Sequence, residues 1–197
     1  MTPQAPRRQY AHLWDASRCI NCGACLLACS STNAPQLAQI ELKDKYRSLA
    51  TNIRRIETEG PKGAQLLLSQ CQQCSAAPCL KKCPGEAIFR DASGLVRTDE
   101  EKCIQCGECV DTCPYGARWM DPQADYPRAC MGPGCNSLVA AGQMPACVQA
   151  CPAMARSFGN AADSASEVAR RIKAGKAQLL DAKLGTKPNF YVVPRSA

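Results

Sequence analysis

Cys103-Ile-Gln-Cys106-Gly-Glu-Cys109-Val-Asp-Thr-Cys113-Pro114 places four cysteines at intervals of two, two and three residues, directly before a proline. An earlier run repeats this spacing, with Ser30 in place of the proline: Cys19, Cys22, Cys25 and Cys29. Two looser runs, each followed by a proline, complete the sixteen cysteines of the chain: Cys71, Cys74, Cys79 and Cys83, and Cys130, Cys135, Cys147 and Cys151. No cysteine is left over, so we read the sequence as four quartets.

The regular spacing is typical of loops that hold [4Fe–4S] clusters. Such a cube needs one thiolate on each iron, and a short loop can deliver three of them while the fourth points away. In two-cluster ferredoxins that fourth cysteine ligates the neighbouring cluster. We expect Gly23 and Gly107 to let the backbone pass close to a cluster, and Gly132 and Gly134 to supply backbone freedom in the longer fourth run. The quartets therefore predict four [4Fe–4S] clusters and a role in electron transfer.

Three other interpretations of the cysteines stay open at this point. Four-cysteine zinc sites also use pairs separated by two residues. An even number of cysteines is compatible with disulfides in an oxidising compartment. A redox or iron sensor with labile clusters is a third possibility, although we find no helix-turn-helix signature for binding DNA. The run spacing favours iron–sulfur clusters over zinc and over disulfides. A sensor usually needs one cluster and a DNA-binding element.

The composition bounds the core and the charge. Leucine, isoleucine, valine and phenylalanine make up about 16% of the 197 residues, which is low for a globular protein. We therefore expect clusters to replace part of the apolar core and folding to depend on their insertion. The formal charge of +7 could suggest nucleic acid, but four oxidised cubes with their thiolates contribute about −8. Basic residues that adjoin the runs are expected to balance part of that charge: Lys81, Lys82, Lys102, Arg118 and Arg128.

The remaining sequence predicts short strands and one helix around the runs. We expect strands at 9–14, 39–42, 52–57, 65–69, 95–98 and 189–193, and one within 83–89 that precedes the strand at 95–98. Gly94 is suited to a turn between the strand within 83–89 and the strand at 95–98. A helix is predicted over 161–175, capped by Asp163 or Ser164 and stopped by Gly175. His12, the only histidine, is expected on the surface of the first strand.

No stretch approaches the roughly 18 apolar residues of a membrane span. Arg7-Arg8 is similar to part of a twin-arginine export signal, but the apolar segment that should follow is missing. We read the pair as part of a charged N-terminal tail.

Over about residues 9–160, the order and spacing of the runs resemble the four-cluster iron–sulfur subunits of dimethyl sulfoxide reductase-superfamily complexes, which include polysulfide, thiosulfate and tetrathionate reductases and respiratory formate dehydrogenases. Gly185-Thr-Lys-Pro-Asn-Phe-Tyr191 resembles the end of the shorter members. The resemblance implies an α+β fold of two nested ferredoxin-like dicluster modules, with short strands, cluster-binding loops and short helices. It implies an outer module of residues 9–35 plus 120–160, a spacer at 36–64, an inner module at 65–119, and a C-terminal helix and tail at 161–197 in possible contact with a partner.

The resemblance also implies which cysteines share a cube. The first set is Cys19, Cys22, Cys25 and Cys151, and the second is Cys29, Cys130, Cys135 and Cys147. The third set is Cys71, Cys74, Cys79 and Cys113, and the fourth is Cys83, Cys103, Cys106 and Cys109. The gap of four residues between Cys130 and Cys135 departs from the family's usual two.

The implied partners are a catalytic subunit with a molybdenum or tungsten bis-pterin cofactor and a membrane subunit that reacts with quinone. The chain itself would catalyse no reaction. We expect it as a peripheral subunit on the outer face of a bacterial cytoplasmic membrane, exported together with the catalytic subunit, with the cytoplasmic face as the alternative. Two alternative functions remain: an electron-transfer subunit of a hydrogenase or carbon monoxide dehydrogenase, and a zinc-stabilised scaffold protein.

Overall fold

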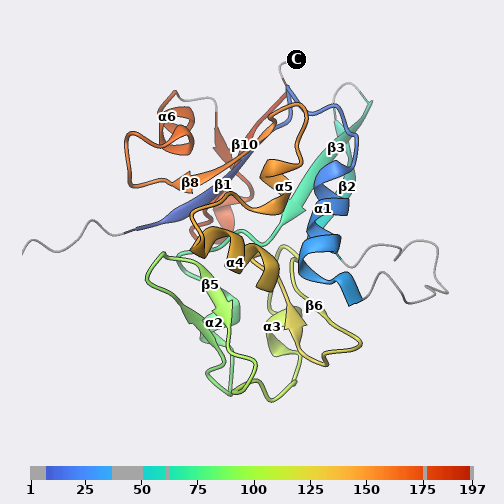
Figure 1. Ribbon diagram of the computed structural model, residues 1–197, viewed down its shortest axis with the longest axis vertical. Helices are drawn as coiled ribbons and strands as arrows, with labels where there is room; N and C mark the ends of the chain where they lie inside the picture. Colours follow the sequence, from blue (N-terminus) through green and yellow to red (C-terminus); the bar gives the residue numbers. More distant parts are fainter. Residues whose placement is uncertain (1–7, 37–50, 61–62, 175–176, 196–197) are drawn as a thin grey trace, which may run out of the picture.

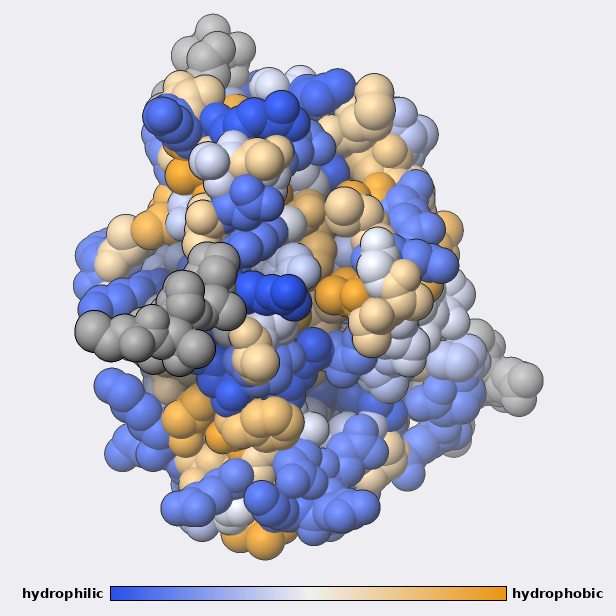
Figure 2. Space-filling view, turned by 60° about the vertical axis from the view of Figure 1, so that its left-hand side comes forward, coloured by the Kyte–Doolittle hydropathy of each residue, from blue (hydrophilic) through white to orange (hydrophobic). Residues whose placement is uncertain are grey.

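A computed structural model describes residues 8–36, 51–60, 63–174 and 177–195. It combines short helices with small sheets, as the sequence predicts (Figure 1). The predicted strand at 39–42 and Gly175 lie outside the described residues. Within the described residues, no helix is long and apolar enough to cross a membrane. The face drawn in Figure 2 carries hydrophobic side chains in small patches between hydrophilic ones.

The largest sheet joins the two ends of the chain. Its four strands follow the order β8-β1-β10-β9: Arg156–Asn160, Tyr10–Asp15, Phe190–Val193 and Gln178–Leu179. β10 runs parallel to β1, whereas β8 and β9 run antiparallel to their neighbours. The predicted first and last strands are therefore confirmed, and the C-terminal tail packs on its own chain.

The predicted C-terminal helix is α6 (Glu167–Lys173), which packs on this sheet. Val168 of α6 contacts Ala11 and Leu13 of β1 in one apolar cluster. The helix begins later than predicted, because Ser166 is its cap: its Oγ accepts a hydrogen bond from the Ala169 amide at 3.1 Å. Asp163 and Ser164 were the wrong candidates, since they lie in the turn before that cap.

Three antiparallel hairpins complete the strands. They are β2–β3 (Ile53–Gly60 with Gly63–Gln70), β4–β5 (Ile88–Arg90 with Val96–Thr98) and β6–β7 (Trp119–Met120 with Pro127–Arg128). The first two contain four of the predicted strands. Gly94 turns the second hairpin with φ of 80°, the left-handed conformation that glycine adopts without a Cβ clash.

Five short helices carry or adjoin the cysteines. They are α1 (Ala24–Asn33), α2 (Pro78–Lys81), α3 (Glu108–Asp111), α4 (Pro133–Ala140) and α5 (Ala146–Gln149). A 3₁₀ turn, η2, spans Ala182–Leu184. α1 lies against α4 and α5, so the first and fourth runs meet, and α2 lies against α3, so the second and third runs meet (Figure 1).

The core is built largely from cysteines. One apolar cluster joins Cys71, Cys74 and Cys79 with Leu95 and Cys130, while a second joins Trp14 and Phe190 with cysteines of the first and fourth runs. Ile53 of β2 belongs to the second cluster and is buried. Part of the predicted spacer therefore packs directly on this core.

His12 overturns one prediction. It is 1% exposed, and its ring lies 4.7 Å from that of Phe158. Burial, together with the nearby Arg156, lowers the pKa of His12 to about 3. The residue is thus a neutral core histidine, because its side chain packs against the Phe158 ring and lies close to Cys130.

Candidate metal centres

The first and third runs form the same loop twice. Asn21 and Gln105 have φ of 60° and 61°, and Gly23 and Gly107 have φ of 77° and 78° directly before α1 and α3. A Cβ on either glycine would meet nothing within 4 Å. Both glycines are therefore needed for a left-handed backbone, and the expected close approach of the backbone to a cluster stays a prediction.

The fourth run needs its glycines for space rather than for a left-handed backbone. Gly132 has φ of −78°, and neither Gly132 nor Gly134 has positive φ. A Cβ on Gly134 would lie 2.0 Å from the carbonyl oxygen of Thr32, and one on Gly132 would lie 2.6 Å from Asn33 Oδ1. The glycines thus allow α4 to approach the end of α1, which corrects the expected role in backbone freedom.

Proline after the fourth cysteine also has a structural consequence. α2, α3 and α5 end before Cys83, Cys113 and Cys151, each of which precedes a proline. A proline inside a helix would remove a hydrogen bond and clash with the preceding turn. Ser30 follows Cys29 instead, and α1 continues to Asn33. The one departure from the proline pattern therefore adds a turn of helix.

Two hollows are lined by cysteines from different runs. The first is lined by Cys19, Cys22, Cys25 and Cys151, with Arg156 among its other residues. The second is lined by Cys71, Cys74, Cys79 and Cys113, with Arg118 among its other residues. In each hollow three cysteines of one run face the fourth cysteine of another.

The remaining cysteines also have neighbours from other runs. The thiols of Cys147, Cys29, Cys71 and Cys135 lie close enough to Cys130 to add to the effect of burial, and together they raise its pKa well above the ordinary value. Burial, modified by charged neighbours that include Cys79, Cys83 and Cys103, raises the pKa of Cys109.

Burial also raises the pKa values of five further thiols. It raises the pKa of Cys71 to about 12 and that of Cys74 to about 11. It also raises the pKa values of Cys25, Cys29 and Cys135. Such thiols hold their protons at neutral pH unless a metal replaces them, because metal binding needs the thiolate. Metal binding here would release protons.

Hydrogen bonds reach several sulfur atoms. The amides of Asn52, Ala117 and Ala155 donate to the sulfurs of Cys29, Cys113 and Cys151 at 3.4, 3.4 and 3.2 Å. Asn33 Nδ2 lies 3.3 Å from Cys135 Sγ and 3.7 Å from Cys29 Sγ. Gln70 Nε2 and His12 Nε2 each lie 3.7 Å from Cys130 Sγ. Such bonds stabilise thiolate charge and tune the potential of a bound cluster.

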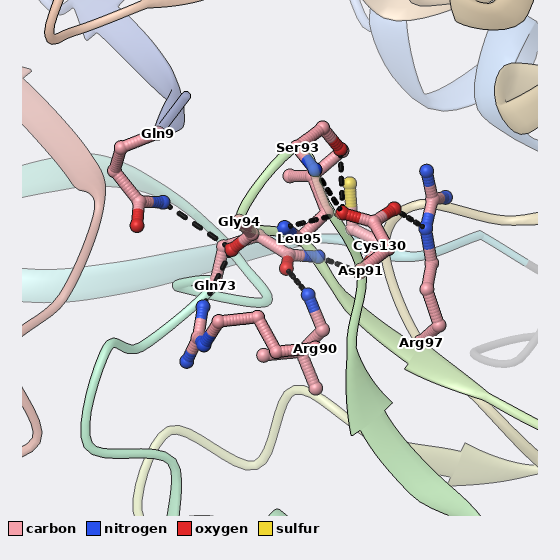
Figure 3. A network of polar contacts seen from close by, with 10 residues as sticks. Gln9, Gln73, Arg90, Asp91, Ser93, Gly94, Leu95, Arg97 and Cys130 are labelled. Carbon is pink, nitrogen blue, oxygen red and sulfur yellow. Dashed lines mark hydrogen bonds and ion pairs between the residues drawn. The ribbon is translucent and has the colours of Figure 1, made fainter. Parts of the chain in front are cut away.

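Gln73 links the loops of two runs with the β4–β5 hairpin. Its side chain donates to the carbonyl of Cys130 and accepts from the amide of Val96. Figure 3 shows this contact beside Asp91, which faces Ser93, Leu95 and Arg97 across the hairpin turn. Arg90 of the same hairpin donates to the carbonyl of Cys74. The hairpin thus positions the second and fourth runs.

The donor geometry favours one kind of metal group. All sixteen cysteines are free thiols in the structure, which gives the disulfide interpretation no support. Among the described residues, which include every cysteine, no three histidine, cysteine or acidic side chains converge closely enough to hold a single metal ion. Zinc needs four sulfurs at about 2.3 Å from one atom, whereas a cube spreads its thiolates over four irons. The sixteen cysteines fit four [4Fe–4S] clusters.

The basic residues divide into two groups. Lys81, Lys82 and Lys102 are exposed, while Arg118 and Arg128 are buried. Arg128 is paired with Asp121 at 2.8 Å.

Arg156 and Asn33 were not predicted from the sequence. Arg156 could have been found, because it repeats the position of Arg118, five residues after the last cysteine of its run.

Comparison with known proteins gives matches along most of the sequence. A 4Fe-4S dicluster domain model matches residues 64–161, and a 4Fe-4S binding domain model matches residues 16–33. Protein NrfC of Escherichia coli is 34% identical over 194 residues, covering 94% of this chain and 81% of the relative. Thiosulfate reductase electron transfer subunit PhsB of Salmonella typhi is 35% identical, covering 79% of this chain and 78% of the relative. One of the chains of the polysulfide reductase of Wolinella succinogenes is 32% identical, covering 95% of this chain and 95% of the relative.

These matches agree with the cysteine-lined hollows and the repeated loops. They extend from the first run through the fourth and cover most of each relative. The chain therefore belongs to the family of iron–sulfur subunits of dimethyl sulfoxide reductase-superfamily complexes.

Proposed function

We propose that the protein is an electron-transfer subunit in which four [4Fe–4S] clusters relay electrons between a molybdenum or tungsten bis-pterin catalytic subunit and a quinone-reactive membrane subunit. It catalyses no reaction by itself. The observation that carries the proposal is the pair of hollows in which three cysteines of one run meet the fourth cysteine of another. This exchange of ligands is the arrangement of two-cluster ferredoxins.

The proposed ligand sets are the four that the resemblance implies. The hollows supply the first and third sets, and the surroundings of Cys130 and Cys109 support the second and fourth. The contacts of α1 with α4 and α5, and of α2 with α3, support two nested dicluster modules. The outer module holds the first and second cubes, and the inner module holds the third and fourth.

The two modules are connected through buried groups. Cys71, a proposed ligand of the third cube, is a close neighbour of Cys130 from the second. Gln70 donates to the Cys130 sulfur and Gln73 to the Cys130 carbonyl. This contact supports a continuous path in the order first, second, third and fourth cube.

Both ends of that path reach the surface. Cys22 of the first set and Cys106 of the fourth are exposed. Ile20 and Ile104, in the same two loops, are 67% and 62% exposed. Exposed apolar residues beside a cluster ligand are suited to partner contacts, so we place one partner at each end.

The relatives support such partners. PhsB is named as the electron transfer subunit of a thiosulfate reductase, and the Wolinella protein is named as part of a polysulfide reductase. For this protein we propose a peripheral position at the outer face of the cytoplasmic membrane.

The first experiment is anaerobic measurement of iron and acid-labile sulfide per polypeptide, together with pull-down of partners from the native host. About sixteen irons with matching sulfide, and co-purification of a pterin-containing oxidoreductase, are expected. Zinc without sulfide would overturn the proposal in favour of a scaffold protein. Co-purification of a hydrogenase or carbon monoxide dehydrogenase would replace the proposed partners.

A further inference from the structure

Two arginines occupy the same place in the two halves of the cluster region. Arg118 follows Cys113 by five residues, and Arg156 follows Cys151 by five. The third residue after each of these cysteines has positive φ: Gly116 at 53° and Met154 at 47°. The amide of the fourth residue after each cysteine, Ala117 or Ala155, donates a hydrogen bond to the sulfur of that cysteine. The corresponding positions after Cys29 and Cys83 hold alanine and isoleucine, so each proposed pair of cubes has one such arginine.

Both guanidinium groups are buried without an acidic partner. Arg118 and Arg156 are each 4% exposed, and among the described residues no carboxylate lies within ion-pair distance of either. Arg118 donates to Thr98 Oγ1 at 3.1 Å, and Arg156 donates to Gln70 Oε1. Among the described residues, Nε of both and Nη1 of Arg156 have no hydrogen-bond partner. A buried cation without a counter-charge is strongly destabilising, so the fold must supply negative charge by another route.

Cysteines of two ligand sets surround each arginine. Arg156 lines the hollow of the first set and also lies near Cys147 and Cys130 of the second. Arg118 lines the hollow of the third set and also lies near Cys109 of the fourth. Burial lowers the pKa of each arginine, but the neighbouring thiols outweigh it, so both pKa values are raised. Each guanidinium therefore stays charged between two groups of sulfur atoms.

We propose that Arg118 and Arg156 are built-in counter-ions, each shared by the two cubes of one pair, and that each raises the reduction potentials of both. The inference rests on the proposed four-cluster function. A cube gains one negative charge when it is reduced, and a nearby cation stabilises that charge most where the dielectric constant is low. Because the cation lies beside both cubes, it stabilises the electron on either one.

The test uses the full cluster-loaded protein, titrated anaerobically with dithionite and mediators and followed by electron paramagnetic resonance. Cys22→Ser and Cys106→Ser assign the signals of the outer and inner pairs. Arg156→Gln is expected to lower the potentials of the outer pair and leave the inner pair unchanged. Arg118→Gln is expected to lower the potentials of the inner pair and to leave those of the outer pair unchanged. A tenfold change in the reduction equilibrium is the expected scale, or about 59 mV for one electron. Each variant is thus the matched control for the other.

Arg156→Lys and Arg118→Lys separate charge from packing, because lysine keeps the charge but not the shape. Lysine variants that keep the native potentials support the proposal, and equal shifts with lysine and glutamine overturn it. If a glutamine variant fails to hold its pair, iron content becomes the measurement: loading restored by lysine supports the proposal, and equal loss contradicts it. Native potentials in a fully loaded glutamine variant also contradict it. These outcomes differ from failure of the proposed function, in which the native protein itself holds no clusters.

Discussion

Asn33, at the end of α1, forms two hydrogen bonds with Cys135, which lies 102 residues away in the sequence. Its Nδ2 donates to Cys135 Sγ at 3.3 Å, while its Oδ1 accepts from the Cys135 amide at 3.0 Å. Asn33 is buried, and Nδ2 also donates to the carbonyl of Cys29. The contact exists because Ser30 lets α1 continue to Asn33 and because Gly132 and Gly134 let α4 approach.

Replacing Asn33 by aspartate is expected to weaken the second proposed cube. The change keeps the shape but places a carboxylate where an N–H donor faced two sulfurs. Loss of a hydrogen bond to a charged group costs about 1.5–3 kcal/mol. We expect faster loss of about one quarter of the iron on exposure to air and a lower potential for this cube, measured by iron release and by redox titration.

Asn136→Asp is the matched control, because Asn136 follows Cys135 in sequence and its Oδ1 makes no hydrogen bond to any described residue. It adds the same charge in the same region while leaving the Asn33 contacts in place. Equal iron loss in the two variants would show that charge alone, and not the lost donor, destabilises the cube.

Replacing Cys29 by serine tests the exchange of ligands between runs. We expect Cys29→Ser to alter the cube that includes Cys130, Cys135 and Cys147, because Cys29 lies beside Asn33 and near Cys147. Electron paramagnetic resonance of the reduced protein measures which signal changes. Cys22→Ser, in the same run, is the control and should alter a different signal. If both variants changed the same signal, the ligand exchange would be refuted.

The sequence predicted six of the ten strands that the structure describes, because these six are bounded by cysteine runs, glycine and proline, but it missed β6, β7, β8 and β9. The hairpin around Gly94 and the strand at 189–193 are confirmed for this reason. Periodicity could not show that Phe158 and Cys130 pack against the side chain of His12, so its burial was missed. Helix starts were also uncertain, since Asp163, Ser164 and Ser166 are all good caps and only the packing of α6 selects one.

The candidate ligands were predictable from spacing alone, but their surroundings were not. Asn33 lies outside the cysteine motifs and reaches Cys135 only after distant segments pack together. The same holds for Gly134, which looks like an ordinary loop glycine until α4 is seen beside Thr32. Contacts between runs depend on tertiary structure, which short motifs do not encode.

Replacing Gly134 by alanine is expected to be strongly destabilising. The new Cβ would lie 2.0 Å from a backbone oxygen, which cannot turn aside as a flexible side chain could. Forcing a methyl group into a packed site typically costs about 1–3 kcal/mol. The thermal midpoint of the cluster-loaded protein should fall by about 2–4 °C for each kcal/mol.

Gly159→Ala in β8 is the matched control, because its Cβ would meet side chains only at 3.6–3.8 Å, an ordinary contact distance. It should leave the thermal midpoint nearly unchanged. A Gly134→Ala midpoint equal to that of Gly159→Ala would mean that α4 does not need this close approach.

Asp91 makes the stability of the β4–β5 hairpin depend on pH (Figure 3). Burial would raise the pKa of its carboxyl group, but hydrogen bonds from Ser93, Arg97 and Leu95 outweigh it and hold the pKa below 3.8. The unfolded chain therefore takes up this proton first as the pH falls. The stabilisation is fully present above the ordinary pKa and is lost as the pH drops through the lowered one.

Asp91→Asn should therefore lower the thermal midpoint by an amount that stays constant from pH 8 to about pH 5 and shrinks below about pH 4. The loss at neutral pH should correspond to about 1–3 kcal/mol, because the turn loses an ion pair and a charged acceptor. Calorimetry of the two proteins across this range measures the difference. Asp163→Asn, at an exposed turn where the carboxylate accepts a single amide bond at 2.9 Å, is the control and should change little. A difference that grows as the pH falls would contradict the assigned role of Asp91, since a group with a lowered pKa can only lose its stabilising effect on acidification.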